Sequence, residues 1–262
     1  MLNKDKSNQN EKTRNRTRYL LKEKSMKNIL KVRMLGGFTL EYKGKELVLD
    51  RNNVSKTTQL FQLLLLHTQD GEISKAALID ALYGRSDVEN KNGSLNNTIF
   101  RLRKQLTAAG LPGSSYININ GGMCTWDPDI ETSVDVCDFK QTIESARHEK
   151  SQKTKMEIYA KAWKLYTGEF LPDMMGEDWA AVENIACRDM YFDCVEELCH
   201  YLKTEEKFEE LYRVAHSAAE IYPFYDWQIW EIDSLIGMSR YKDGLCLLYT
   251  SPSPRDRQKS RM

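Results

Sequence analysis

The chain has 262 residues, and its 38 Lys/Arg balance its 38 Asp/Glu to a net charge of zero. A hydrophobic content of 41% supports folded cores, and the length suits about two domains. No apolar run approaches the roughly 18 residues of a membrane span, and the polar N-terminus does not resemble a secretory signal, so we expect a cytoplasmic protein without membrane contact.

The charges are distributed unevenly. Residues 1–27 hold nine Lys/Arg and three Asp/Glu, residues 28–127 hold twelve and nine, and residues 128–245 hold thirteen and twenty-five. A basic N-terminal part and an acidic C-terminal part indicate that only the N-terminal part contacts nucleic acid, whereas the C-terminal part binds proteins. Chance variation between two ordinary domains is the alternative.

Cysteines and histidines point to no metal site and no catalytic site. The six cysteines form no CxxC pair, and the metal-like group Cys194, Cys199 and His200 occurs once, so buried thiols in a reducing compartment are favoured. The four histidines are spread along the chain, and no GxSxG, HExxH, Walker A or dinucleotide motif occurs. We therefore expect neither an enzyme nor a cofactor.

In chain order, the composition of residues 1–28 predicts a disordered basic arm, with Met26 as an alternative start. Residues 29–42 predict a strand that bends at Gly36-Gly37, followed by a turn and a second strand over 46–49. Ser55 and Ser74 are suitable N-caps for helices over about 56–68 and 75–82.

A polar loop over 84–93 then precedes a third helix over about 94–109, and residues 116–126 predict a hairpin with Gly121-Gly122 at its tip. The third helix is the most informative segment. Leu95, Ile99, Leu102 and Leu106 form one apolar face. The opposite face carries no carboxylate and is formed by Ser94, Asn97, Arg101, Lys104 and Gln105.

That polar face has the chemistry of DNA recognition. Asn and Gln amides pair with adenine, Arg pairs with guanine, and Lys neutralises phosphate, so the face suits a DNA major groove. A solvated surface helix that lacks acids is the alternative.

The second half predicts helices beginning near Val134 and over 153–166, 178–203, 205–222 and 226–240. Phe208 and Tyr241 lie 33 residues apart in similar surroundings, a period typical of tetratricopeptide (TPR-like) helical repeats.

Two resemblances follow from these residues. Residues 30–127 resemble the OmpR/PhoB-type winged-helix output domain of bacterial transcription factors, most specifically at Ile99–Leu106. Residues 133–245 resemble the bacterial transcriptional activator domain of the activators named after antibiotic regulatory proteins, most clearly at the Gly-Glu-Phe-Leu-Pro run that ends at Pro172.

The expected fold is an α+β winged helix-turn-helix with a small N-terminal sheet, followed by an all-α TPR-like repeat domain. Its parts are a basic arm (1–28), a winged-helix DNA-binding domain (29–127) and a helical activator domain (133–245). Residues 246–262 look like a non-native tail that truncates the helical domain, because Pro252 and Pro254 interrupt the repeat pattern.

The expected function is a sequence-specific DNA-binding transcriptional regulator. Asn97 and Arg101 are the first choices for base contacts. Contacts to the DNA backbone are assigned to Ser94, Thr98, Lys104, Arg103 and Lys56. The hairpin contributes Asn118 and Asn120, which are neutral where many members of the family carry a cation.

The resemblance implies activation through contact with RNA polymerase, by way of the loop over 84–93. The net charge of residues 28–127 is only +3, so a monomer should bind DNA weakly. A homodimer on repeated half-sites would raise the affinity. The rival function is a protein-interaction scaffold whose winged helix docks protein rather than DNA.

Overall fold

We describe the fold from a computed structural model, which describes residues 29–49, 54–68, 71–113 and 115–250. The predicted basic arm (1–28) and residues 251–262 of the predicted tail lie outside these ranges. The chain divides into two compact units. Unit 1 runs to Met34 and from Phe38 to Val134, and unit 2 contains Leu35–Gly37 and the residues from Asp135 onward.

A four-stranded sheet opens unit 1, in the order β3-β2-β1-β7. Its strands are β1 (Leu30–Arg33), β2 (Thr39–Tyr42), β3 (Lys45–Leu47) and β7 (Thr132–Val134). The first three are antiparallel, with Leu30 opposite Tyr42, and β7 pairs in parallel with β1. One prediction was therefore wrong, because Gly36-Gly37 separates two paired strands rather than bending one. The helix predicted to begin near Val134 begins at Asp135, and Val134 itself ends β7.

Three helices follow in unit 1: α2 (Lys56–Leu66), α3 (Lys75–Tyr83) and α4 (Lys91–Ala108). The predicted caps are confirmed, because Ser55 accepts from the amide of Thr58 and Ser74 accepts from that of Ala77. The third helix begins earlier than predicted. Asn90 caps it by accepting from the amide of Gly93, so the loop before it spans only 84–90.

A second, three-stranded sheet completes unit 1, in the order β4-β6-β5. The predicted hairpin is confirmed as β5 (Ile117–Asn120) and β6 (Met123–Trp126), and the unexpected short strand β4 (Ile73–Ser74) pairs with β6. Aromatic rings join this sheet to α2: Trp126 lies 5.1 Å from Phe61 and 6.4 Å from Tyr116 between ring centroids. These contacts fix the hairpin in the core that also holds the helices.

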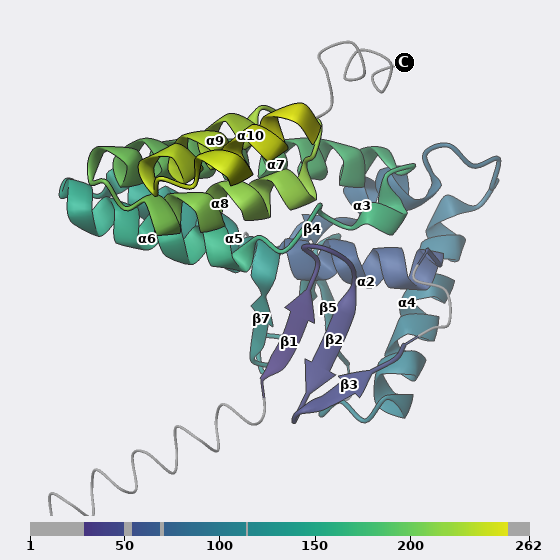
Figure 1. Ribbon diagram of the computed structural model, residues 1–262. Coiled ribbons are helices and arrows are strands. Elements are labelled where there is room, and N and C mark those ends of the chain that lie inside the picture. Colours follow the sequence, from purple (N-terminus) through teal and green to yellow (C-terminus); the bar gives the residue numbers. More distant parts are fainter. Residues whose placement is uncertain (1–28, 50–53, 69–70, 114, 251–262) are drawn as a thin grey trace, which may run out of the picture. The chain divides into compact units, whose positions relative to one another are not determined.

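Unit 2 is helical, and each of its α-helices packs on the next in chain order (Figure 1). Its elements are α5 (Asp135–His148), α6 (Gln152–Leu165), the 3₁₀ turn η1 (Pro172–Met174), α7 (Asp178–Thr204), α8 (Phe208–Ile221), α9 (Trp227–Gly237) and α10 (Tyr241–Thr250). Residues 246–250, which the sequence assigned to the non-native tail, continue α10.

Buried tyrosines join the helices of unit 2. The hydroxyls of Tyr166 and Tyr222 lie 2.6 Å apart, and the ring of Tyr166 stacks on Tyr191 at 4.1 Å between centroids.

In the Gly-Glu-Phe-Leu-Pro run, Phe170 is fully buried and its amide donates to Asn184 Oδ1 at 2.9 Å. That run therefore anchors the connection between α6 and α7.

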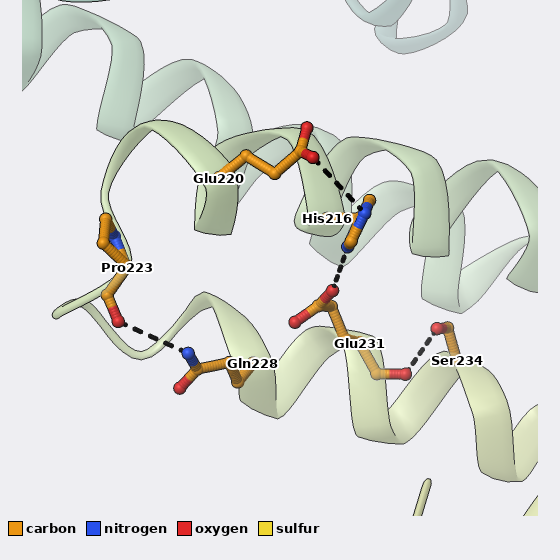
Figure 2. A network of polar contacts seen from close by, with 6 residues as sticks. All are labelled: His216, Glu220, Pro223, Gln228, Glu231 and Ser234. Carbon is orange, nitrogen blue, oxygen red and sulfur yellow. Dashed lines mark hydrogen bonds and ion pairs between the residues drawn. The ribbon is translucent and has the colours of Figure 1, made fainter. Parts of the chain in front are cut away.

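A polar network joins α8 to α9 (Figure 2). Glu231 is 2% exposed, and its Oε1 lies 2.7 Å from Nδ1 of His216, which extends toward it from α8. The hydroxyl of Ser234 donates to the carbonyl of Glu231. The buried carboxylate of α9 is thus met by a polar partner, as burial of a charge requires.

Among the described residues, no helix combines the length and the hydropathy that crossing a membrane requires.

Candidate nucleic-acid interface

The apolar face of α4 anchors this helix in unit 1. Leu95, Ile99, Leu102 and Leu106 are each at most 3% exposed, as the sequence predicts. The helix packs on α2 and α3 along this face. Burying four aliphatic side chains contributes on the order of 6–12 kcal/mol before conformational entropy is counted, so the helix is held firmly.

The opposite face of α4 presents an exposed strip formed by Asn96, Asn97, Phe100, Arg101 and Lys104. In the part of the chain that the structure describes, neither Arg101 nor Lys104 forms an ion pair. The strip contains amides, cations and one ring, and no carboxylate. We call these five residues the α4 strip.

Sequence reasoning overlooked two members of the α4 strip. Phe100 is 67% exposed, although its residue type favours burial, and Asn96 is exposed beside Asn97. The helical wheel could have found both, since they fall away from the leucine face. An exposed phenylalanine between an amide and a cation can meet the methyl group of thymine in a major groove.

Thr98 was expected at the DNA backbone, and the structure corrects this. The residue is 6% exposed, its hydroxyl lies 2.7 Å from that of Tyr83, and it donates to the carbonyl of Ser94. Thr98 therefore ties the end of α3 to α4 and has no access to a phosphate. Ser94 itself is half-buried at the edge of the α4 strip.

The prediction that Arg103 contacts the DNA backbone is corrected in the same way. Its guanidinium donates to the carbonyl of Ser115 at 2.8 Å and to that of Ile117 at 2.7 Å, at the start of the hairpin. Two charge-assisted bonds hold the planar group in one orientation, so it does not extend to phosphate. Arg103 positions the hairpin against α4.

The tip of the hairpin is a tight turn at Gly121 and Gly122. Both have positive φ angles, 57° and 84°, which a two-residue turn of the type I′ kind requires. Asn118 and Asn120 are exposed on β5, and Asn118 accepts from the hydroxyl of Ser115. The hairpin thus offers amides and backbone groups for hydrogen bonding, without a cation.

Two further predicted groups lie partly covered. Lys56 begins α2, and its ammonium donates to Oε1 of Gln59 at 2.9 Å. Gln105 was assigned to the polar face of the third helix, but it is half-buried and its Oε1 has no hydrogen-bond partner among the described residues. Asn97, Arg101 and Lys104 are consequently the predicted residues that α4 presents most openly.

The thiol near these residues, Cys124, is buried, and so are the thiols of unit 2 except that of Cys246. Burial raises the pKa of Cys124, against the opposing effect of Lys75 and Arg103, and burial raises the pKa of Cys199 to about 12. Protonated thiols are weak nucleophiles and weak metal ligands at neutral pH. Among the described residues, no group of three or more His, Cys, Asp or Glu is placed to hold a metal ion.

Comparisons with known proteins bear on the fold. No family model matches the chain, and no curated protein matches it. Among solved structures it is similar to Mycobacterium tuberculosis EmbR, determined in complex with a low affinity phosphopeptide, with a TM-score of 0.59 and 15% sequence identity. The match covers 87% of this chain and 63% of the EmbR chain, so a small N-terminal sheet followed by a mostly helical body is a fold that the two share.

Proposed function

We propose that this protein is a sequence-specific DNA-binding transcriptional regulator and that α4 enters the major groove of duplex DNA. The single observation that carries the proposal is the α4 strip. It projects amides and cations from a helix whose other face is fixed in a core. A rigid helix with that surface satisfies both requirements of base recognition, placement and hydrogen-bonding chemistry.

The proposal assigns a role to each exposed group of α4. Arg101 pairs with guanine, Asn97 pairs with adenine, and Phe100 contacts a thymine methyl group. Lys104 neutralises a phosphate and fixes the position of the helix without reading sequence. Lys56 supplies a further phosphate contact from the first turn of α2, where the helix dipole also favours an anion.

The remaining parts support this assignment. Residues 29–127 form the proposed winged-helix domain, with Asn118 and Asn120 of the hairpin as neutral partners of the DNA backbone. Residues 133–245 form the proposed helical activator domain. The resemblance to activators of the antibiotic-regulatory-protein type, together with the fold shared with EmbR, supports transcription regulation as the function.

Activation would follow from contact with RNA polymerase through the loop between α3 and α4. By position, this is the loop of the related winged helices that meets polymerase. In this chain it spans Gly84 to Asn90 and includes the half-exposed Val88 beside Asp87 and Glu89.

The experiment that tests the proposal is selection of bound duplexes from a random DNA library, using the full chain and the Arg101→Ala variant. We expect an enriched motif with a guanine that the variant no longer requires. Failure to enrich any motif at low salt, from protein that is folded, would contradict the proposal and favour the scaffold function.

A further inference from the structure

A groove in unit 2 lies between α6 and α8, with α7 as its floor. Both helices pack on α7. The groove has a volume of about 400 Å³, and Leu198, Tyr201 and Leu202 of α7 contribute to its lining. A second hollow of about 740 Å³ shares Trp163 and Lys164 with it and continues along α8 to Ser217 and Glu220. The groove is therefore elongated rather than a closed pocket.

The rim of the groove is cationic. Lys153 and Lys164 of α6, Lys207 at the N-cap of α8, and Arg213 of α8 are all exposed, and two carboxylates, Glu157 and Glu210, accompany them. Within the described ranges none of the four cations forms an ion pair, although the ammonium of Lys207 lies 5.7 Å from the ring centroid of Tyr201.

This excess of cations is exceptional in its surroundings. Residues 128–245 hold thirteen Lys/Arg against twenty-five Asp/Glu, yet four of the thirteen gather at this one groove. Among the described residues, the interhelical ion pairs of unit 2 use other cations, among them Lys140, Lys155 and Lys203. The cations of the groove are left available for a ligand of opposite charge.

The shape of the groove limits that ligand. Lys153 and Lys164 lie eleven residues apart on α6, a separation of about 16 Å. An extended peptide of about five residues spans this length. The rings of Trp163 and Tyr201 and the aliphatic groups of Leu198 and Leu202 provide apolar surface for one or two of its side chains. Duplex DNA fits less well, because the acidic remainder of unit 2 repels a long polyanion.

We propose that this groove binds an acidic peptide segment of a partner protein. Carboxylates of the segment pair with Lys153, Lys164, Lys207 and Arg213, and an apolar side chain packs on Trp163 and Tyr201. Cations around an apolar floor provide both the charge and the anchor that recognition of a short peptide needs. The groove lies wholly in unit 2, so the proposal does not depend on DNA recognition by α4.

The test begins with selection from a displayed library of random peptides on the full chain. Selected peptides are then synthesised with a fluorophore, and their dissociation constants are measured by anisotropy. The variant is Lys164→Glu/Arg213→Glu. The control is Lys161→Glu, which reverses one charge rather than two at an exposed residue of α6 that does not line the groove.

We expect acidic peptides to be enriched and the dissociation constant to rise by about tenfold or more in the double variant, with a change below about twofold in the control. Both variants should unfold at the temperature of the native protein, since the replaced side chains are exposed. The proposal is overturned if no acidic peptide is enriched, if the double variant binds like the native chain, if the control loses as much affinity, or if unlabelled duplex DNA displaces the peptide.

Discussion

The α4 strip of unit 1 and the helix contacts of unit 2 use charged side chains in opposite ways. In unit 2, Lys155 meets Glu197 at 3.5 Å and Lys203 meets Asp233 at 2.6 Å, and each pair joins two helices. On α4, Arg101 and Lys104 are exposed and have no ion pair among the described residues. Charges that are paired within the fold hold helices together, whereas unpaired charges on a fixed helix are available to a partner.

Arg101 and Arg103 test this difference most strongly, because both are arginines of α4. Arg101 is exposed, whereas Arg103 is hydrogen-bonded within the fold. Arg103→Ala removes the guanidinium that donates to the carbonyls of Ser115 and Ile117, and among the described residues only Ser115 keeps another donor, the amide of Ile117. The free energy of unfolding should therefore fall by about 1.5–3 kcal/mol. Arg101→Ala should change it by less than about 0.5 kcal/mol but weaken binding to the selected duplex by about 1–3 kcal/mol. Urea unfolding and duplex titration of both variants provide the measurements.

Two helical glycines of unit 2 test its packing. A Cβ at Gly237 would lie 2.4 Å from the ring of Phe208, whereas a Cβ at Gly244 would meet Leu235 at an ordinary 3.6 Å. Gly237→Ala should lower the free energy of unfolding by about 1–3 kcal/mol through overpacking. Gly244→Ala should leave it unchanged or raise it by up to about 1 kcal/mol. Thermal unfolding that ranks the two in the reverse order would refute this packing of α8 on α9.

The contact between His216 and Glu231 is a smaller test of paired charge. His216→Ala removes the partner of a carboxylate that is 2% exposed, so the free energy of unfolding should fall by about 1–2 kcal/mol. Adding Glu231→Gln to this variant should recover part of the loss, because the buried charge is then gone. If the two substitutions instead act additively, the contact drawn in Figure 2 does not couple α8 to α9.

The proposed contact between Phe100 and a thymine methyl group should have the smallest effect on DNA binding. Replacing one thymine of the selected duplex by deoxyuridine removes a methyl group, which should weaken binding to the native chain by about 0.8 kcal/mol. The Phe100→Ala variant should be insensitive to this replacement. The comparison is made at each thymine in turn, and equal sensitivity of both proteins at every position would exclude the contact.

Much of the fold was predictable because local rules govern it. Ser55 and Ser74 cap their helices as their residue type indicates, and the leucine face of α4 is buried as its spacing indicates. Strand β7 was missed because its three residues pair with β1, about one hundred positions earlier, and nothing local marks that partner.

The candidate site was predictable in part for the same reason. Exposure of Asn97, Arg101 and Lys104 follows from the helical period. The partners of Thr98 and Arg103 do not, since Tyr83 and the hairpin carbonyls come from other elements. The peptide groove was out of reach of sequence reasoning, because its cations come from segments separated by up to sixty residues, from Lys153 to Arg213.

The measurement that tests recognition of DNA by α4 most directly is a double-mutant cycle, which combines a side-chain substitution in the protein with a base substitution in the duplex. The native chain and Arg101→Ala are each titrated with the selected duplex and with a duplex whose contacted guanine is replaced by adenine, at about 50 and 200 mM salt. We predict a coupling energy of about 1–3 kcal/mol between Arg101 and that guanine at both salt concentrations. A coupling energy of zero at every guanine of the site would contradict the central claim, because Arg101 would then act on DNA only as a charge.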